Sequence, residues 1–285
     1  MQQFLMLEQI FPSHHVGDFQ ITAISDGYLQ APLGLLSNID PIDATQMQNR
    51  AGQRPPDAVH INCYLLRSAG HTVLIDAGAG GIKQWGGLLL QNLTLAGVSP
   101  AEIDTILLTH AHPDHVGGLL NAAGQCVFPN AELVVHRSEW DFWRDDAHLS
   151  RASDRTRGNF QIARNVFESY DRQLRTFEAG EVLPGVLAMP LPGHTQGHTG
   201  YLLTSAERNL LVWGDIVHFP HIQIQRPDVT IAFDQDATLS ASTRTRMLDM
   251  ATADELLIAG MHLGELGFAR IQRERSGFSL QYHHN

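Results

Sequence analysis

The chain has 285 residues, of which 43% are hydrophobic and 17% charged, the balance of a soluble globular protein with a sizeable core. Its formal net charge of −11 argues against nucleic acid and against an anionic membrane surface as partners, because both require basic surface. Two cysteines, Cys63 and Cys126, are too few for a disulfide framework, and neither belongs to a CxxC metal motif.

The amino-terminal segment 1–11 has no basic region followed by a long apolar stretch, so a secretion signal is not expected. No run approaches the ~20 apolar residues that a membrane span needs. A cytoplasmic protein without a membrane partner is therefore expected.

The first part of the chain predicts strands and turns. Residues 18–24 alternate between apolar and polar types, which predicts an early strand, whereas 31–57 are rich in Pro, Asp, Asn and Gln and are expected to form surface loops. Apolar runs at 61–67 and 71–76 flank a Ser-Ala-Gly turn, the pattern of a hairpin.

The second strand of that hairpin ends at Asp76, which we interpret as a structural carboxylate bonded to nearby backbone amides rather than as a ligand. A helix is expected over 85–95, stopped by Gly97. Residues 99–102 read Ser-Pro-Ala-Glu, a capping box with proline at the first helical position, and predict a second short helix.

The chemistry of the chain is concentrated after the next strand. Residues 103–108 form an apolar run typical of a buried strand. Four side chains able to bind a metal then follow within six positions: His110, His112, Asp114 and His115. Pro113 is expected to interrupt regular structure, which would leave these side chains on a turn. Imidazole and carboxylate ligands suit a borderline cation such as zinc, and their density disfavours the alternative of a merely polar turn.

The following region changes in character. A helix start is expected at 119–123 and a strand at 133–136. Within residues 137–177, Trp140 and Trp143 lie three apart, and apolar or aromatic side chains recur every three or four positions over 160–177, which predicts a helical insertion. Two interpretations remain open: these aromatics pack as outer helices, or they wall a substrate pocket.

The carboxyl-terminal half repeats the pattern of a strand followed by a metal-competent residue. Apolar segments lead to His194, to Asp215 and to His262. Loops at strand ends converge above the edges of a sheet, so the earlier cluster is expected to be half of a larger site.

The HxHxDH motif, together with the segments PGHTQGHT, GD and the late histidine, resembles the metallo-β-lactamase superfamily. The resemblance implies an αββα four-layer sandwich over 1–285 as a single domain, with the helical insertion at 137–177. It also implies two divalent metal ions, with zinc expected and iron, manganese or cobalt as alternatives. The implied ligands are His110, His112 and His194 for the first ion, Asp114, His115 and His262 for the second, and Asp215 as the bridge.

Such a centre would activate a bridging hydroxide as nucleophile, because metal coordination lowers the pKa of water to about 7. Asp114 is also a candidate catalytic residue that steers this hydroxide or carries a proton to the leaving group. His218 stands where the smaller acyl-homoserine lactone lactonases have a tyrosine, so it is either a catalytic donor or a packed histidine. His198 is expected to orient the loop around His194.

Four segments resemble methyl parathion hydrolase and related lactonases and esterases: GDFQITAISDGYLQAPL, LLTHAHPDHVGGL, FPNAELVV and LVWGD. The implied activity is hydrolysis of a small neutral ester-like substrate, foremost a lactone of the acyl-homoserine or aryl type. The alternatives are a phosphotriesterase and, from another class, a non-catalytic metal-stabilised binding protein. Because the resembling enzymes are often dimers, a homodimer is expected.

Overall fold

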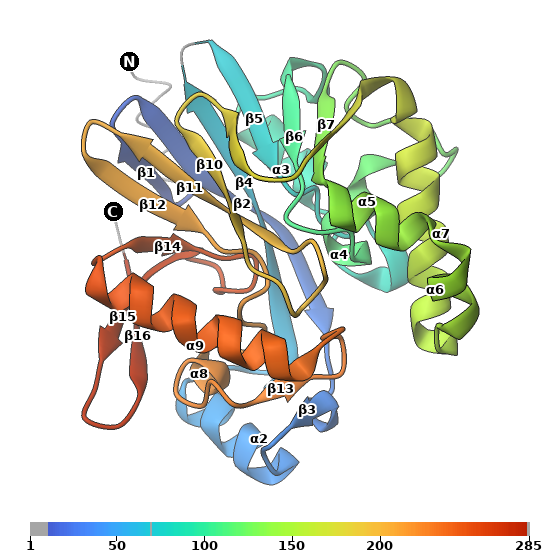
Figure 1. Ribbon diagram of the computed structural model, residues 1–285. Coiled ribbons are helices and arrows are strands. Elements are labelled where there is room, and N and C mark those ends of the chain that lie inside the picture. Colours follow the sequence, from blue (N-terminus) through green and yellow to red (C-terminus); the bar gives the residue numbers. More distant parts are fainter. Residues whose placement is uncertain (1–10, 69, 284–285) are drawn as a thin grey trace.

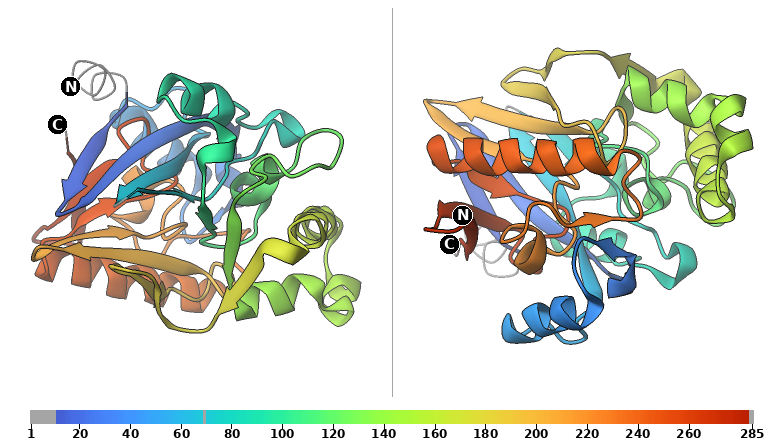
Figure 2. Two further views of the ribbon diagram at one scale, coloured as in Figure 1. Left: turned by 90° about the horizontal axis from the view of Figure 1, so that it is seen from above. Right: turned by 60° about the horizontal axis from the view of Figure 1, so that its bottom comes forward.

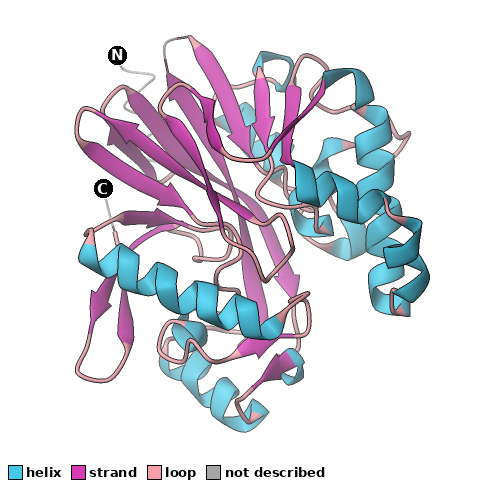
Figure 3. Ribbon diagram, in the orientation of Figure 1, coloured by secondary structure: helices cyan, strands magenta, loops and turns pink. Residues whose placement is uncertain are grey.

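The computed structural model describes residues 11–68 and 70–283, so the expectation for the extreme amino terminus lies outside the described residues. Within this part of the chain, two seven-stranded sheets pack face to face, and helices cover both outer surfaces (Figure 1, Figure 3). The predicted αββα sandwich is therefore confirmed. No helix among the described residues is long and apolar enough to cross a membrane.

The two sheets divide the chain roughly in half. In spatial order, the first sheet contains β1 (Ser13–Val16), β2 (Phe19–Gln30), β4 (Ala58–Ser68), β5 (His71–Ile75), β6 (Thr105–Leu107), β7 (Glu132–His136) and β8 (Leu174–Phe177). The second contains β16 (Phe278–Tyr282), β15 (Phe268–Arg273), β14 (Leu257–Ala259), β12 (Arg208–Val212), β11 (Thr199–Ser205), β10 (Val186–Pro190) and β9 (Gly180–Leu183). A small ribbon pairs β3 (Leu36–Ser37) with β13 (Thr230–Ile231).

The helices are α2 (Pro41–Arg50), α3 (Leu89–Leu95), α4 (Pro113–Val116), α5 (Arg137–Arg144), α6 (Asp146–Arg151), α7 (Asp154–Ser169), α8 (Pro220–Gln223) and α9 (Ala237–Ala253). Helix α9 lies along the outer surface of the second sheet, whereas α5 and α7 lie beside the first sheet (Figure 2).

Strand β4 shows why the apolar runs are nearly continuous. Its Tyr64 and Leu66 face the second sheet, whereas Cys63 and Leu65 face the outer helices. A strand buried on both faces needs apolar residues at every position, so alternation is lost. The predicted hairpin is confirmed, with Leu66 opposite Val73.

Three expectations were wrong or incomplete in detail. Pro113 does not interrupt structure but begins α4, because a helix's first residue needs no amide hydrogen. The helix expected at 119–123 is absent from the described structure: a short 3-10 turn ends at Leu119, and Leu120 then bridges Cys126. The segment 31–57 holds α2, whose first turn is capped by the Asp40 side chain.

The helical insertion is confirmed over α5–α7, but its last part is the edge strand β8 rather than helix. Four of its aromatic side chains are buried in the core between these helices and the first sheet, namely Trp143, Phe160, Phe167 and Tyr170, whereas Trp140 and Phe142 are partly buried. These side chains pack the insertion against the first sheet, which favours the interpretation that the insertion forms outer helices rather than a pocket wall.

Candidate metal centre

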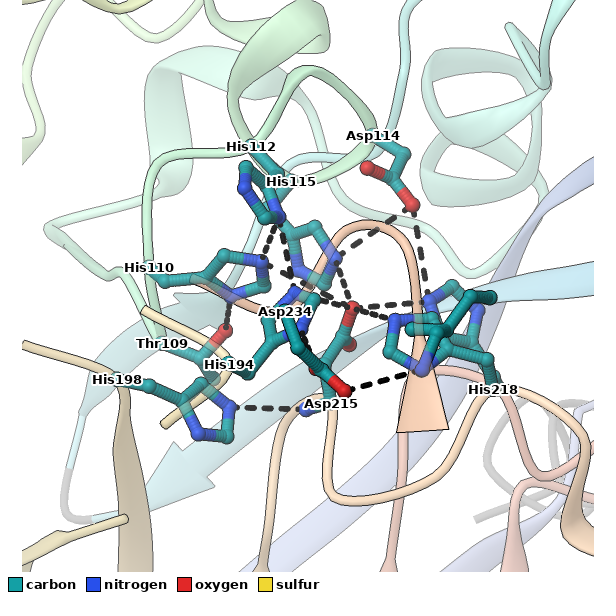
Figure 4. Close-up of polar contacts among 12 residues, drawn as sticks. Thr109, His110, His112, Asp114, His115, His194, His198, Asp215, His218 and Asp234 are labelled. Atoms are coloured by element: carbon teal, nitrogen blue, oxygen red, sulfur yellow. Dashed lines mark hydrogen bonds and ion pairs between the residues drawn. The ribbon is translucent and has the colours of Figure 1, made fainter. Parts of the chain in front are cut away.

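The site forms where loops from both sheets meet. His110, His112 and the α4 residues follow β6, His194 follows β10, Asp215 follows β12 and His262 follows β14. Figure 4 shows the side chains of His110, His112, Asp114, His115, His194 and Asp215 converging on one another, and the side chain of His262 belongs to the same cluster. All are buried except Asp114, whose side chain is 13% exposed.

One set of ring nitrogens, which we call the first group, belongs to His110, His112 and His194. Nδ1 of His112 lies 3.0 Å from Nε2 of His110 and 2.9 Å from Nε2 of His194. Two ring nitrogens that bind one zinc ion at 2.0–2.1 Å lie roughly 3 Å apart. The spacing therefore fits a shared cation.

The second group consists of Asp114, His115, Asp215 and His262. Nε2 of His115 and Nε2 of His262 each lie 3.3 Å from Oδ2 of Asp215 and 3.6 Å from Oδ2 of Asp114. Two imidazoles and two carboxylate oxygens thus surround a common point, a donor set that suits a divalent cation.

Asp215 connects the two groups. Its Oδ2, which lies 3.3 Å from two histidines of the second group, is also 3.4 Å from Nε2 of His194 and 3.8 Å from Nε2 of His110 in the first group. Its Oδ1 is buried and accepts no hydrogen bond from the described residues. A buried carboxylate oxygen without a donor is costly, and a bound cation would satisfy it.

The outward nitrogens of the histidines have partners of their own. Nδ1 of His115 donates to Asp76 at 2.7 Å, Nδ1 of His194 to Asp234 at 2.9 Å, and Nδ1 of His262 to the carbonyl of His60 at 2.7 Å. In the neutral ring, each bond places the proton on Nδ1 and leaves the lone pair of Nε2 aimed at the site, which is how metal-binding histidines are oriented.

Thr109 orients His110 in the same manner. Its hydroxyl donates to Asp76 at 2.7 Å, so its oxygen is left to accept from Nδ1 of His110 at 3.1 Å. The sequence predicted a structural role for Asp76 but gave no sign of Asp234, which lies forty positions from the histidine that it contacts.

Charge divides the two groups. Burial lowers the pKa of His110 and of His112 well below the ordinary value, and neighbouring imidazoles add to this effect. Burial also opposes a proton on His115, but the carboxylates of Asp215 and Asp114 raise its pKa well above the ordinary value. The rings of His110 and His112 are thus neutral, whereas the carboxylates of the second group attract a positive charge.

His198 lies next to the site rather than in it. Its Nδ1 donates to the carbonyl of Leu191 at 2.8 Å, and its Nε2 accepts from the backbone amide of Asp215 at 2.9 Å. Burial lowers the pKa of His198 to about 3, so the ring is neutral and can accept. It joins the loop of His194 to the bridging aspartate.

His218 is buried within the site. Its Nε2 lies 3.1 Å from Oδ2 of Asp215, and its ring stacks on His262 with 5.3 Å between centroids. Nδ1 is buried and has no hydrogen-bond partner among the described residues. Together with His194 and Asp215, it forms a third set that could hold a metal ion.

Two neighbouring cavities, which share lining residues, lie beside these side chains. A small chamber of about 80 Å³ is bounded by Asp114 and Asp215, by the aromatic rings of Trp85 and Phe233, and by Asn159 of α7. A larger cavity of about 910 Å³ shares His218 and His262 with the chamber, and its mixed lining includes the polar side chains of Gln48, Gln53, His60, His221 and Tyr282. The shape is neither a long apolar groove nor a closed aromatic pocket.

The chain is similar to known proteins along most of its length. A family model described as the Metallo-beta-lactamase superfamily matches residues 56–262. An uncharacterized protein of Bacillus subtilis (strain 168) is 32% identical over 56% of this chain and 63% of its own, so the chain spans just under two thirds of that relative. An N-acyl homoserine lactonase of a Bacillus species is 23% identical over 66% of this chain and 76% of its own.

Two solved structures share the whole fold. A hydrolase named AbOPH, in the beta lactamase superfamily, superposes with a TM-score of 0.90 at 28% identity, covering 96% of this chain and 98% of its own. AidC, a dizinc quorum-quenching lactonase, superposes with a TM-score of 0.89 at 23% identity and the same coverage.

Proposed function

The chain belongs to the metallo-beta-lactamase superfamily, and from this premise we propose that it is a binuclear metal-dependent hydrolase of small neutral esters, foremost of lactones. The first group would hold one divalent ion and the second group the other, with Asp215 shared. Zinc is the proposed metal, because histidine and aspartate at this spacing suit it. Iron, manganese and cobalt are the alternatives.

The position of Asp215 carries the proposal. A single oxygen lies between 3.3 and 3.8 Å from ring nitrogens of both groups. One carboxylate beside two donor sets is what two cations at about 3.5–4 Å need, because it offsets their repulsion. When bound, such ions polarise a substrate oxygen and make water nucleophilic at neutral pH.

Two side chains of the chamber are proposed as catalytic. Asp114 is the most exposed member of the second group and lines the chamber, so it can hold a proton between the nucleophilic water and the leaving group. His218 lines both cavities, and we propose that its ring donates a hydrogen bond to the substrate's carbonyl oxygen.

The sizes of the two cavities suit a substrate whose reactive group is small and whose remainder is larger. A ring of lactone size suits the small chamber, and the remainder of the molecule would extend into the larger cavity. The N-acyl homoserine lactonase among the relatives agrees with this substrate class.

A phosphotriesterase is the second candidate, because Trp85 and Phe233 give the chamber two aromatic faces that an aryl leaving group could contact. The relation to methyl parathion hydrolase implied by the sequence remains a prediction. So do the homodimer, which light scattering of the full chain would test, and the cytoplasmic location.

Rates on three substrates would decide between the activities: an acyl-homoserine lactone, dihydrocoumarin and methyl parathion, each with zinc-loaded protein. We expect the lactones to be hydrolysed with the higher kcat/KM. Faster turnover of methyl parathion would favour the phosphotriesterase. Metal-loaded protein that hydrolyses none of a broad ester panel would point to the binding protein instead.

A further inference from the structure

Glu139 is a fully buried carboxylate outside the metal-competent groups. It lies on α5, at the start of the helical insertion. Its Oε2 accepts hydrogen bonds from the backbone amide of Ala111 at 3.0 Å and from the indole of Trp143 at 2.8 Å. Its Oε1 accepts from the backbone amide of Gly197 at 3.1 Å.

The two backbone partners of Glu139 belong to the loops of the first group. Ala111 lies between His110 and His112, and Gly197 lies three residues after His194. These loops come from different sheets, since one follows β6 and the other follows β10. One side chain therefore joins the two pieces of backbone that must be in register for three imidazoles to share a cation.

The contact is also tightly packed. A Cβ added at Gly197 would lie 2.6 Å from the backbone nitrogen of Glu139 and 2.9 Å from its Cγ. A backbone hydrogen bond also joins the segments that follow β6 and β10, from the amide of Thr199 to the carbonyl of Thr109 at 2.9 Å. That bond lies outside the span of the ligands, whereas Ala111 is flanked by two of them.

We propose that Glu139 is a positioning residue that fixes the loops of the first group relative to each other and so sets the affinity for the first metal. The inference rests on the proposed metal centre. It requires a carboxylate rather than an amide, because both oxygens face N–H donors. A glutamine would turn its NH₂ group against one of those donors and leave it unpaired.

Asp26 provides a matched control. It is also fully buried, and it accepts from the backbone amides of Ala79 at 2.8 Å, Gly87 at 2.9 Å and Leu89 at 2.9 Å. None of these three residues lies in a loop that carries a proposed ligand. An amide at this position disturbs a comparable buried network without touching the loops of the first group.

The test uses full-length protein loaded with zinc and titrated with a chelator, with bound zinc counted at each step. Glu139→Gln should release one of its two zinc ions about 10- to 100-fold more readily than the wild type, whereas Asp26→Asn should release zinc as the wild type does. Excess zinc should restore the occupancy of Glu139→Gln.

Equal zinc retention in the Glu139→Gln and Asp26→Asn variants would overturn the role, and a wild type that binds no zinc would overturn both this role and the metal centre. Should Glu139→Gln fail to fold, Gly197→Ala tests the same contact from the other loop. The Gly197→Ala variant keeps the carboxylate of Glu139 but crowds it. We expect this variant to release one zinc ion at a lower chelator concentration than the wild type does. Wild-type retention by Gly197→Ala would then contradict the role.

Discussion

The carboxylate of Asp76 accepts a hydrogen bond from Nδ1 of His115 at 2.7 Å while it also binds the amide and the hydroxyl of Thr109. Asp76 adopts a left-handed backbone conformation with φ of 57°, which asparagine also tolerates. One side chain at the end of β5 thus orients a ligand of each group, His115 directly and His110 through the threonine.

Asp76→Asn should therefore weaken metal binding without unfolding the chain. An amide facing Nδ1 of His115 favours the tautomer with the proton on Nε2, the atom that must bind the cation. We expect affinity for the second metal to fall about 10- to 100-fold, measured by competition with a chromophoric chelator. Asp104→Asn is the control, because the exposed Asp104 accepts from the backbone amide of Thr72, near the turn between β4 and β5. Equal affinities of the two variants would contradict the role of Asp76.

The substitution His218→Phe distinguishes two roles for His218: a catalytic hydrogen-bond donor or a side chain that only packs. Phenylalanine keeps the stacking on His262 but cannot donate a hydrogen bond. We expect kcat/KM on a lactone to fall about 10²-fold or more while the metal content stays unchanged. His221→Phe, which alters only the larger cavity, should retain more activity. Unchanged turnover in His218→Phe would show that His218 only packs.

Arg244 holds the segment after Asp215 against helix α9. Its buried guanidinium donates to the carbonyls of Ile216, Pro227 and Val229 at 2.6 to 2.8 Å. Arg244→Met would remove the guanidinium donor from the carbonyls of Ile216 and Pro227, whereas that of Val229 keeps the side-chain amide of Gln223 at 3.2 Å. We therefore expect the free energy of unfolding to fall by about 3 kcal/mol in urea titrations. Arg246→Met, on the exposed side of the same helix, should change it by less than about 0.5 kcal/mol. Similar losses in both variants would refute the assignment.

His14 makes the fold sensitive to acid. Burial lowers the pKa of His14 to about 4, and the charges of His283 and Arg270 act in the same direction. In the unfolded chain the pKa returns to about 6.5, so below that value the unfolded state binds a proton that the folded state does not. The contribution of a neutral His14 is fully present above about pH 6.5 and declines as the pH falls toward 4.

His14→Gln should remove this part of the decline. Urea titrations of both proteins in chelator, at pH 7.5 and near pH 5, measure the free energy of unfolding. The wild type should lose roughly 1 kcal/mol more than the variant on acidification, a value reduced for partial exposure. Equal losses of the free energy of unfolding in the wild type and in His14→Gln would show that His14 does not contribute to the acid sensitivity.

The clustered part of the site could be predicted from the sequence because its spacing is local. His110, His112, Asp114 and His115 follow one buried strand, and three further strands end in metal-competent residues. Strand ends are brought together by the sheets themselves, so a list of such ends indicates which side chains can meet. The structure places all seven within the two groups.

Supporting roles were expected for Asp76 and His198, but other supporting contacts could not be predicted, because no spacing encodes them. Glu139 and Asp234 contact loops far away in sequence, and each sits in a segment whose charges look like ordinary surface. The start of α4 was misjudged for a different reason: Pro113 both breaks a helix interior and begins a helix, and the sequence does not distinguish these positions.

The most direct test is the metal content of purified protein measured together with lactone hydrolysis, for the wild type and for His110→Ala. We expect two divalent ions per wild-type chain, and fewer ions with a loss of activity of at least about 10²-fold in the variant. A wild type without bound transition metal, or a His110→Ala variant with full activity, would contradict the proposed centre.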